Sequence, residues 1–189
     1  MKRYLLCITG ASGVIYGLRT LRALIEGGHE IHCIVSPWGE RVIETETRRN
    51  FNSWAEELGL GREYIYSPDD LAAPPASGSF KLDGTLIVPC SMSSIGTIAA
   101  GISRNLIHRA ALTALKEARP LVLTPRETPL SLIDLRNLTA LAEAGAAIVP
   151  AAPAFYREPK TIEDLTDFMA GKILDRLGLE HTLFKRWGT

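Results

Sequence analysis

Glycines and a serine stand where an apolar run meets a helix-like pattern near the start of the chain. The turn Thr9–Gly13 reads Thr-Gly-Ala-Ser-Gly. Glycines permit a tight turn, Ser12 is a good helix N-cap, and the free amides of a new helix attract anions. The turn therefore predicts a phosphate site, although a plain strand-to-helix turn shares these features. It lacks the dinucleotide fingerprint G-x-G-x-x-G, which needs glycine at position 12.

Three further polar segments follow later apolar runs. Residues 91–97 carry four hydroxyls, which suit a phosphate, a flavin edge or a helix cap. Residues 125–129 read Pro-Arg-Glu-Thr-Pro, where a guanidinium for phosphate adjoins a possible base, unless the two form a surface ion pair. Tyr156 ends a proline-rich segment and is either a site hydroxyl or a packed ring. Ser36 stands where NAD enzymes usually carry an acidic residue, which argues against NAD.

The hydrophobic pattern predicts the elements that position these residues. Short apolar runs indicate buried strands at 4–9, 31–35, 85–89, 121–124 and 147–149, and helical spacing indicates helices at 14–25, 37–48, 51–58, a segment ending at 116, 131–144 and 162–177. This alternation predicts an α/β, Rossmann-like (flavodoxin-like), mainly parallel sheet with helices on both faces, in three layers. Such sheets bind ligands at the carboxyl ends of their strands. We expect a single domain over 1–189, with a C-terminal tail from about 178.

Composition narrows the possible partners. Lys+Arg and Asp+Glu number 21 each, so no overall charge favours nucleic acid or an anionic membrane. No apolar run approaches the roughly 20 residues that span a bilayer. The three cysteines are scattered, which predicts reduced thiols rather than a disulfide framework or a metal cluster. We therefore expect a cytoplasmic protein without a metal.

Ordered motifs along almost the whole chain resemble one family. The motifs at 125–130 (Pro-Arg-Glu-Thr-Pro-Leu) and 153–156 (Pro-Ala-Phe-Tyr) weigh most. Others lie at 9–13, 16–17, 45–47, 74–78, 89–91, 105–106, 109–111, 115–117, 119–123 and 186–188. Together they resemble the flavin prenyltransferases of the UbiX type, within the wider FMN-binding flavoprotein fold.

The resemblance implies an activity and partners. It implies transfer of a dimethylallyl group from dimethylallyl monophosphate to N5 and C6 of reduced FMN, without a metal. The product, prenylated FMN, serves UbiD-type decarboxylases. The resemblance also implies a homo-oligomer, a dodecamer with active sites at subunit interfaces.

It further implies roles for individual residues. The implied FMN site comprises Gly10, Ala11, Ser12, Ser36, Ser91, Met92, Ser93, Ser94 and Arg126. The implied prenyl-phosphate site comprises Arg109, Lys116, Arg126, Tyr156 and Lys172, with Trp187 lining the pocket. Glu127, with Ser12 as relay, would accept the released protons, and Glu46 is the second carboxylate. Without the resemblance, the helical Lys, Arg and Glu46 side chains would be ordinary surface residues, and Trp187 an anchor for the tail.

Three alternatives share part of this pattern. FMN-dependent cysteine decarboxylases use a histidine shortly before the third main strand and a Pro-x-Met-Asn segment after the fourth. Here residues 75–79 lack histidine, and residues 125–128 read Pro-Arg-Glu-Thr. A non-catalytic flavin carrier or accessory subunit would not need the additional cations. Direct decarboxylation of an aromatic acid would need a carboxylate site separate from the phosphate cluster, and the sequence does not indicate one.

Overall fold

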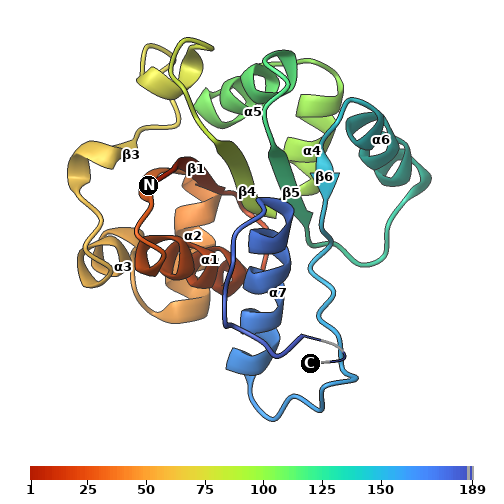
Figure 1. Cartoon of the computed structure of the whole chain (residues 1–189). Coiled ribbons are helices and arrows are strands. Elements are labelled where there is room, and N and C mark those ends of the chain that lie inside the picture. Colours follow the sequence, from red (N-terminus) through yellow and green to blue (C-terminus); the bar gives the residue numbers. More distant parts are fainter. Residues whose placement is uncertain (187, 189) are drawn as a thin grey trace.

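Six parallel strands form one sheet at the centre of the molecule (Figure 1). The computed structural model describes residues 1–186 and Gly188. The strands are β1 (Arg3–Ile8), β2 (Glu30–Val35), β3 (Ile65–Tyr66), β4 (Gly84–Cys90), β5 (Leu121–Pro125) and β6 (Ala147–Ile148). Their order across the sheet is β3-β2-β1-β4-β5-β6, and every neighbouring pair is parallel.

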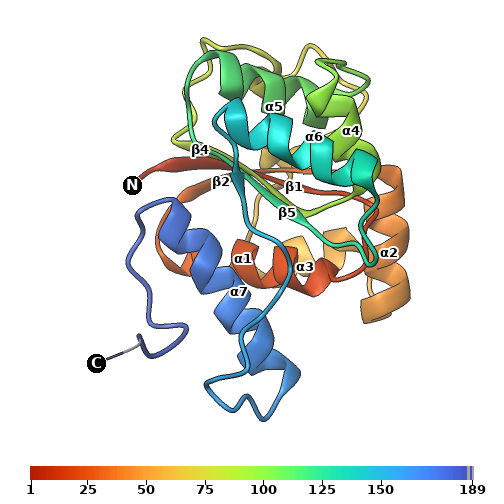
Figure 2. The same ribbon diagram turned by 90° about the vertical axis from the view of Figure 1, so that its right-hand side faces the viewer.

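Seven α-helices of the described part of the chain connect and cover the strands. They are α1 (Val14–Glu26), α2 (Pro37–Thr47), α3 (Phe51–Glu57), α4 (Met92–Ala99), α5 (Leu106–Lys116), α6 (Leu132–Glu143) and α7 (Ile162–Arg176). Helices α1, α3 and α7 lie on one face of the sheet and α4, α5 and α6 on the other, while α2 stands beside the end of β1 (Figure 2). The predicted three-layer, Rossmann-like fold is confirmed.

Alternating side chains of each strand fill two separate cores. On β1, Leu6 and Ile8 pack toward the α1 and α7 layer, whereas Leu5 and Cys7 pack toward the α4 and α5 layer. All four side chains are fully buried. A strand covered on both faces has no polar positions, and this explains the continuous apolar runs in the sequence.

The strand order places a topological switch point at the carboxyl ends of β1 and β4. The chain proceeds outward from β1 to β2 and β3, and then returns to the other side of β1 with β4. At such a switch point the connections leave in opposite directions, and open α/β sheets bind their ligands there, so we call this place the crevice. The turn after β1 and the serine-rich segment after β4 therefore meet at one place.

Most predicted elements agree with the structure within a few residues. The two-residue strand β3 escaped prediction because it lies in an irregular stretch and is too short to show a period. The expected helix ending at 116 is two helices, since the chain breaks after α4 and α5 restarts at the N-cap Asn105, whose Oδ1 accepts from the His108 amide at 3.1 Å. Within residues 1–186, no helix combines the length and apolar character that a membrane crossing requires. The single-domain boundary stays a prediction.

Candidate active site

The turn between β1 and α1 has the shape that its glycines suggested, but its contacts differ from the expectation. Gly13 has φ 93°, a left-handed conformation that side chains rarely adopt. Gly10 lies against α2, where an added Cβ would come within 2.4 Å of the Cβ of Trp38. Gly13, not Ser12, is the N-cap of α1, and no side chain of the turn caps the helix. The expectation that Ser12 caps α1 is therefore wrong.

Glu46 supplies the missing cap from the last turn of α2. Its Oε1 accepts from the Gly13 amide at 3.0 Å, and its Oε2 accepts from the Val14 amide at 3.1 Å. A carboxylate at a helix N-terminus is favoured because the helix dipole is positive there. The amides that we expected to bind phosphate are thus bound by a carboxylate. Burial and the nearby charge of Glu46 raise the pKa of Tyr16, one turn into α1.

Thr9 joins the ends of β1 and β4 at the switch point. Its hydroxyl donates to the carbonyl of Pro89 at 2.9 Å and accepts from the amide of Ser91 at 2.7 Å. Thr9 is buried, so these bonds are shielded from water. Sequence reasoning did not select Thr9, although a threonine that ends a buried strand before a glycine is a usable signal. The hydroxyl fixes the distance between the two loops of the candidate site.

The serines after β2 and β4 begin helices at this same edge. Ser36 caps α2 by accepting from the Gly39 amide at 3.0 Å. Ser91 caps α4 by accepting from the Ser94 amide at 3.3 Å, and its hydroxyl lies 3.1 Å from that of Ser94. The capping role that the sequence left open for the serines of 91–97 is therefore real at Ser91, and Ser36 has the same role without having been predicted to. Ser93 is exposed beside them, while Met92 and Ser91 are half-buried.

Arg126 connects the end of β5 to the turn after β1. Its Nε donates to the backbone carbonyl of Ser12 at 3.1 Å. The guanidinium has five N–H groups, of which this bond occupies one, so it remains suited to an anion. The neighbouring Glu127 is exposed, and its Oε1 accepts from the Thr128 amide at 3.1 Å. Within one chain, the Glu127 carboxylate is therefore folded onto its own loop, and the relay through Ser12 stays a prediction.

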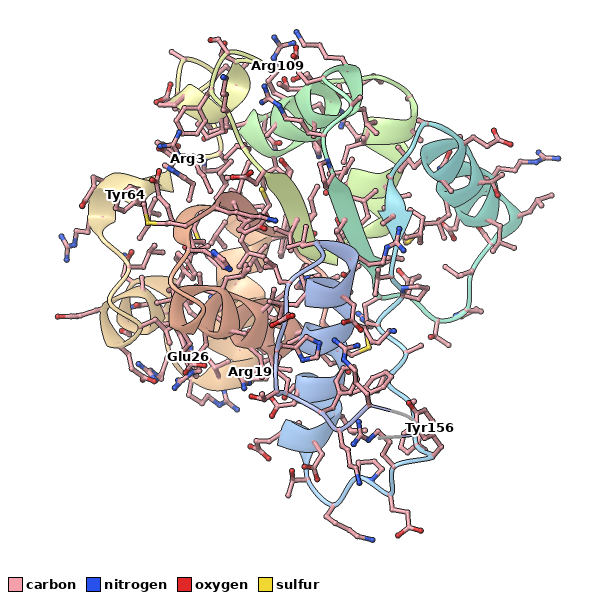
Figure 3. The ribbon with its side chains drawn as sticks, in the orientation of Figure 1. Arg3, Arg19, Glu26, Tyr64, Arg109 and Tyr156 are labelled. Atoms are coloured by element: carbon pink, nitrogen blue, oxygen red, sulfur yellow. The ribbon has the colours of Figure 1, made fainter. Side chains whose placement is uncertain are left out.

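The other expected phosphate-binding residues lie away from Arg126. Arg109 donates through Nε to the carbonyl of Ala76 at 3.0 Å, and it lies on the opposite side of the molecule from Tyr156 (Figure 3). Lys116 ends α5 at the amino edge of the sheet and pairs with Glu117 at 3.5 Å. A single chain therefore does not bring these cations to one phosphate.

The remaining two expected residues belong to the C-terminal part of the chain. Tyr156 is exposed, with its ring 6.4 Å from that of Phe168 in an edge-to-face contact. Lys172 lies on α7, with its Nζ 3.5 Å from the Asp175 carboxylate. Trp187 lies outside the described residues.

The three thiols are not suited to nucleophilic chemistry. Cys7, Cys33 and Cys90 are unpaired and buried, as the sequence predicted. Burial raises the pKa of each thiol far above neutral pH. Cys90 adjoins the serine segment but is protonated there. Among residues 1–186 and Gly188, no group of three His, Cys, Asp or Glu side chains has the arrangement of a metal site.

Comparison with known proteins identifies the family. The model of the Flavoprotein family matches residues 1–174. A protein from Methanocaldococcus jannaschii named flavin prenyltransferase UbiX is 44% identical, over 99% of both chains. One of the same name from Pseudomonas aeruginosa is 41% identical, over 99% of this chain and 94% of its own. The chain belongs to the flavin prenyltransferase family.

Solved structures of this family share the whole fold. AnUbiX (PadA1), crystallised with FMN and dimethylallyl pyrophosphate, superposes with a TM-score of 0.94 at 41% identity, over 100% of this chain and 98% of its own. A dodecameric FMN-dependent UbiX-like decarboxylase from Escherichia coli O157:H7 gives 0.93 at 41% identity, over 99% and 100%. A PPC decarboxylase, at 20% identity and a TM-score of 0.63, shares the fold alone.

Proposed function

We propose that this flavin prenyltransferase family member transfers a dimethylallyl group from dimethylallyl monophosphate to N5 and C6 of reduced FMN. The observation that carries the proposal is the end-to-end likeness to a protein crystallised with FMN and dimethylallyl pyrophosphate. The product is prenylated FMN, the cofactor of UbiD-type decarboxylases. No metal takes part, because Arg and Lys side chains stabilise the departing phosphate.

The crevice between β1 and β4 is the proposed FMN site. Its donors fit a flavin phosphate, since Arg126 is held there by Ser12 and hydroxyls begin two helices beside it. Glu46 already binds the first amides of α1, so the phosphate uses the serine hydroxyls, the other backbone amides and Arg126. The proposed contacts are Gly10, Ala11, Ser12, Ser36, Ser91, Met92, Ser93, Ser94 and Arg126.

The proposed chemistry uses two sets of side chains: carboxylates that accept protons and cations that hold the leaving phosphate. The C–O bond of the prenyl phosphate breaks, and its electron pair leaves with the phosphate. A C–N bond forms at N5 as the C–O bond breaks. The double bond of the attached prenyl group then takes up a proton, and its tertiary carbon forms a C–C bond at C6. The protons displaced from N5 and C6 need an acceptor, and one of them can be returned to the double bond. Glu127, relayed by Ser12, accepts them, and Glu46 is the second carboxylate. The leaving phosphate is held by Arg109, Lys116, Arg126, Tyr156 and Lys172, and Trp187 shields the cation.

These phosphate ligands meet only if several copies of the chain assemble. We therefore propose a homo-oligomer, a dodecamer, with each active site at a subunit interface. The dodecameric relative supports this. So does α6, which exposes Leu132, Ile133 and Leu135 by 61%, 69% and 49%, because contiguous apolar side chains on a surface mark contact sites. The unpaired thiols support a cytoplasmic location.

The decisive test is mass spectrometry of the flavin after anaerobic incubation with reduced FMN and dimethylallyl monophosphate. We expect a product heavier by one isoprene unit, and inorganic phosphate in equal amount. Unmodified FMN, together with release of CO₂ from a cysteinyl peptide or an aromatic acid, would instead establish one of the decarboxylase alternatives. A cypemycin decarboxylase and an FMN-dependent cysteine decarboxylase, each 16% identical to this chain, resemble it at the level of fold alone.

A further inference from the structure

Asp175 collects three basic groups from two segments of the chain. It lies near the end of α7, and its side chain is only 20% exposed. Oδ1 accepts from Arg186 Nη2 at 2.8 Å and lies 3.3 Å from His181 Nε2, while Oδ2 lies 3.5 Å from Lys172 Nζ. Burial alone would raise the pKa of Asp175, but the hydrogen bond and charge of Arg186, together with the charges of His181 and Lys172, hold that pKa below its ordinary value.

Residues 181–186, which we call the tail, also pack on α7 through aromatic rings. The Phe184 ring lies 5.1 Å from that of Phe168 and 4.9 Å from that of His181. The guanidinium of Arg157, from the loop before α7, lies 5.3 Å above Phe184. The tail is thus held in its middle by ring contacts and at both ends by Asp175. It closes one side of a cavity of about 440 Å³ between the tail, α7 and residues 154–160.

Lys172 is the most loosely held of the three basic groups. Its contact with Asp175 is the longest, and its side chain is 48% exposed. A surface pair of this kind contributes little, so Lys172 can turn to a phosphate at small cost. The Asp175 carboxylate keeps Arg186 and His181 when that happens, and the tail stays docked.

We propose that Asp175 is a positioning residue for the prenyl phosphate, because it docks the tail beside Lys172, the proposed ligand of that phosphate. The inference rests on the proposed function through the role of Lys172. It adds a residue that touches no substrate itself but fixes the tail beside a side chain that does. The carboxylate acts through Arg186 and His181, which both contact Oδ1, and an amide at position 175 keeps one acceptor oxygen but loses the charge that strengthens both contacts.

The test compares Asp175→Asn with the parent, using full-length, FMN-loaded protein. We expect the Kd for dimethylallyl monophosphate, measured by calorimetry, to rise roughly tenfold, as for loss of one charge-assisted hydrogen bond. Hydrogen exchange of the tail should quicken, while the Kd for FMN and the melting temperature stay unchanged. Glu163→Gln is the matched control, since it removes an exposed carboxylate from the same helix. Combined with Arg186→Gln, Asp175→Asn should weaken binding no further than either change alone.

Three results would overturn the role. An unchanged Kd in Asp175→Asn would show that tail docking does not serve the substrate. An unchanged exchange rate would show that Asp175 does not dock the tail. If Asp175→Asn also weakened FMN binding and lowered the melting temperature, Asp175 would be a general structural residue. If the parent binds dimethylallyl monophosphate yet forms no prenylated flavin, the proposed function fails, whereas this binding comparison still decides the role of Asp175.

Discussion

The crevice between β1 and β4 and the outlying cations differ in how the chain places them. At the crevice, residues far apart in sequence are joined by short bonds, as between Thr9 and Ser91 at 2.7 Å and between Arg126 and Ser12 at 3.1 Å. The cations Arg109, Lys116 and Lys172 lie on helix surfaces, where each contacts a partner away from the crevice: the Ala76 carbonyl, Glu117 and Asp175, respectively. The sheet therefore builds the proposed flavin site within one chain, whereas the proposed phosphate site needs further copies.

Replacing Glu127 by Gln tests the chemistry at the crevice and carries the largest expected effect. The change keeps the shape but removes a basic carboxylate from an exposed loop, so the variant should fold and bind FMN normally. Formation of prenylated flavin should slow by about 10²- to 10⁴-fold, as for removal of a general base. Single-turnover absorbance beside a flavin titration measures both quantities.

Arg126→Ala provides the contrast to Glu127→Gln. It removes the bond to Ser12 and a charge from the crevice, so the affinities for FMN and for dimethylallyl monophosphate should both fall. If Glu127→Gln formed prenylated flavin at the rate of the parent protein, the Glu127 carboxylate would only bind the Thr128 amide within its loop. The proton acceptor would then be Glu46 or the released phosphate.

Mixed oligomers test whether the outlying cations complete the crevice of another copy. Lys116→Gln and Arg126→Gln should each be nearly inactive alone. When the two variants are co-expressed with different tags and purified as mixed oligomers, about a quarter of the sites should combine two intact residues from different chains. Activity should recover to that fraction.

Lys2→Gln co-expressed with Arg126→Gln is the control for this recovery, since Lys2 is exposed and lies outside the proposed site. That mixture should retain activity in proportion to its intact Arg126. If the mixed oligomers of the Lys116 and Arg126 variants were no more active than either variant alone, the two residues would serve a site within one chain, or Lys116 would have no part in the site.

The sequence predicted which strand ends form the crevice, but not the long-range contacts made there. The strand ends were predictable because buried parallel strands are continuous apolar runs, and Ser36, Ser91 and Arg126 each follow one directly. The cap on α1 was not predictable, because Glu46 contacts Gly13 from 33 residues away in the sequence, and such a contact depends on how α2 packs. The contacts of Asp175 were not predicted for the same reason, since nothing in the sequence around a helical aspartate indicates that the tail folds onto it.

Replacing Glu46 by Gln tests the cap, with a smaller expected effect. The neutral amide loses the charge that faces the α1 N-terminus, which should cost about 0.3–1 kcal/mol in the free energy of unfolding. Glu44→Gln, an exposed carboxylate one half-turn earlier in α2, is the matched control. Denaturant unfolding of both variants measures the difference.

The rate of prenylation in Glu46→Gln then separates two roles. A rate that falls in step with stability would mean that Glu46 only caps α1. A much larger fall at full FMN occupancy would make it the second proton acceptor. Equal stability of the two variants would contradict the contacts with Gly13 and Val14.

Removal of metal ions should leave the rate of prenylation unchanged. The proposed phosphate site is composed of cations, and the described residues contain no group of three His, Cys, Asp or Glu side chains that could hold a divalent metal. Turnover of protein treated with EDTA should therefore equal that of untreated protein, measured as prenylated flavin per minute with reduced FMN in excess. Dithionite-reduced FMN prepared over chelating resin excludes metal carried in with the substrate. If chelation abolished turnover and Mg²⁺ restored it, the phosphate would be held by a metal, and Arg109, Lys116 and Lys172 would lose their proposed role.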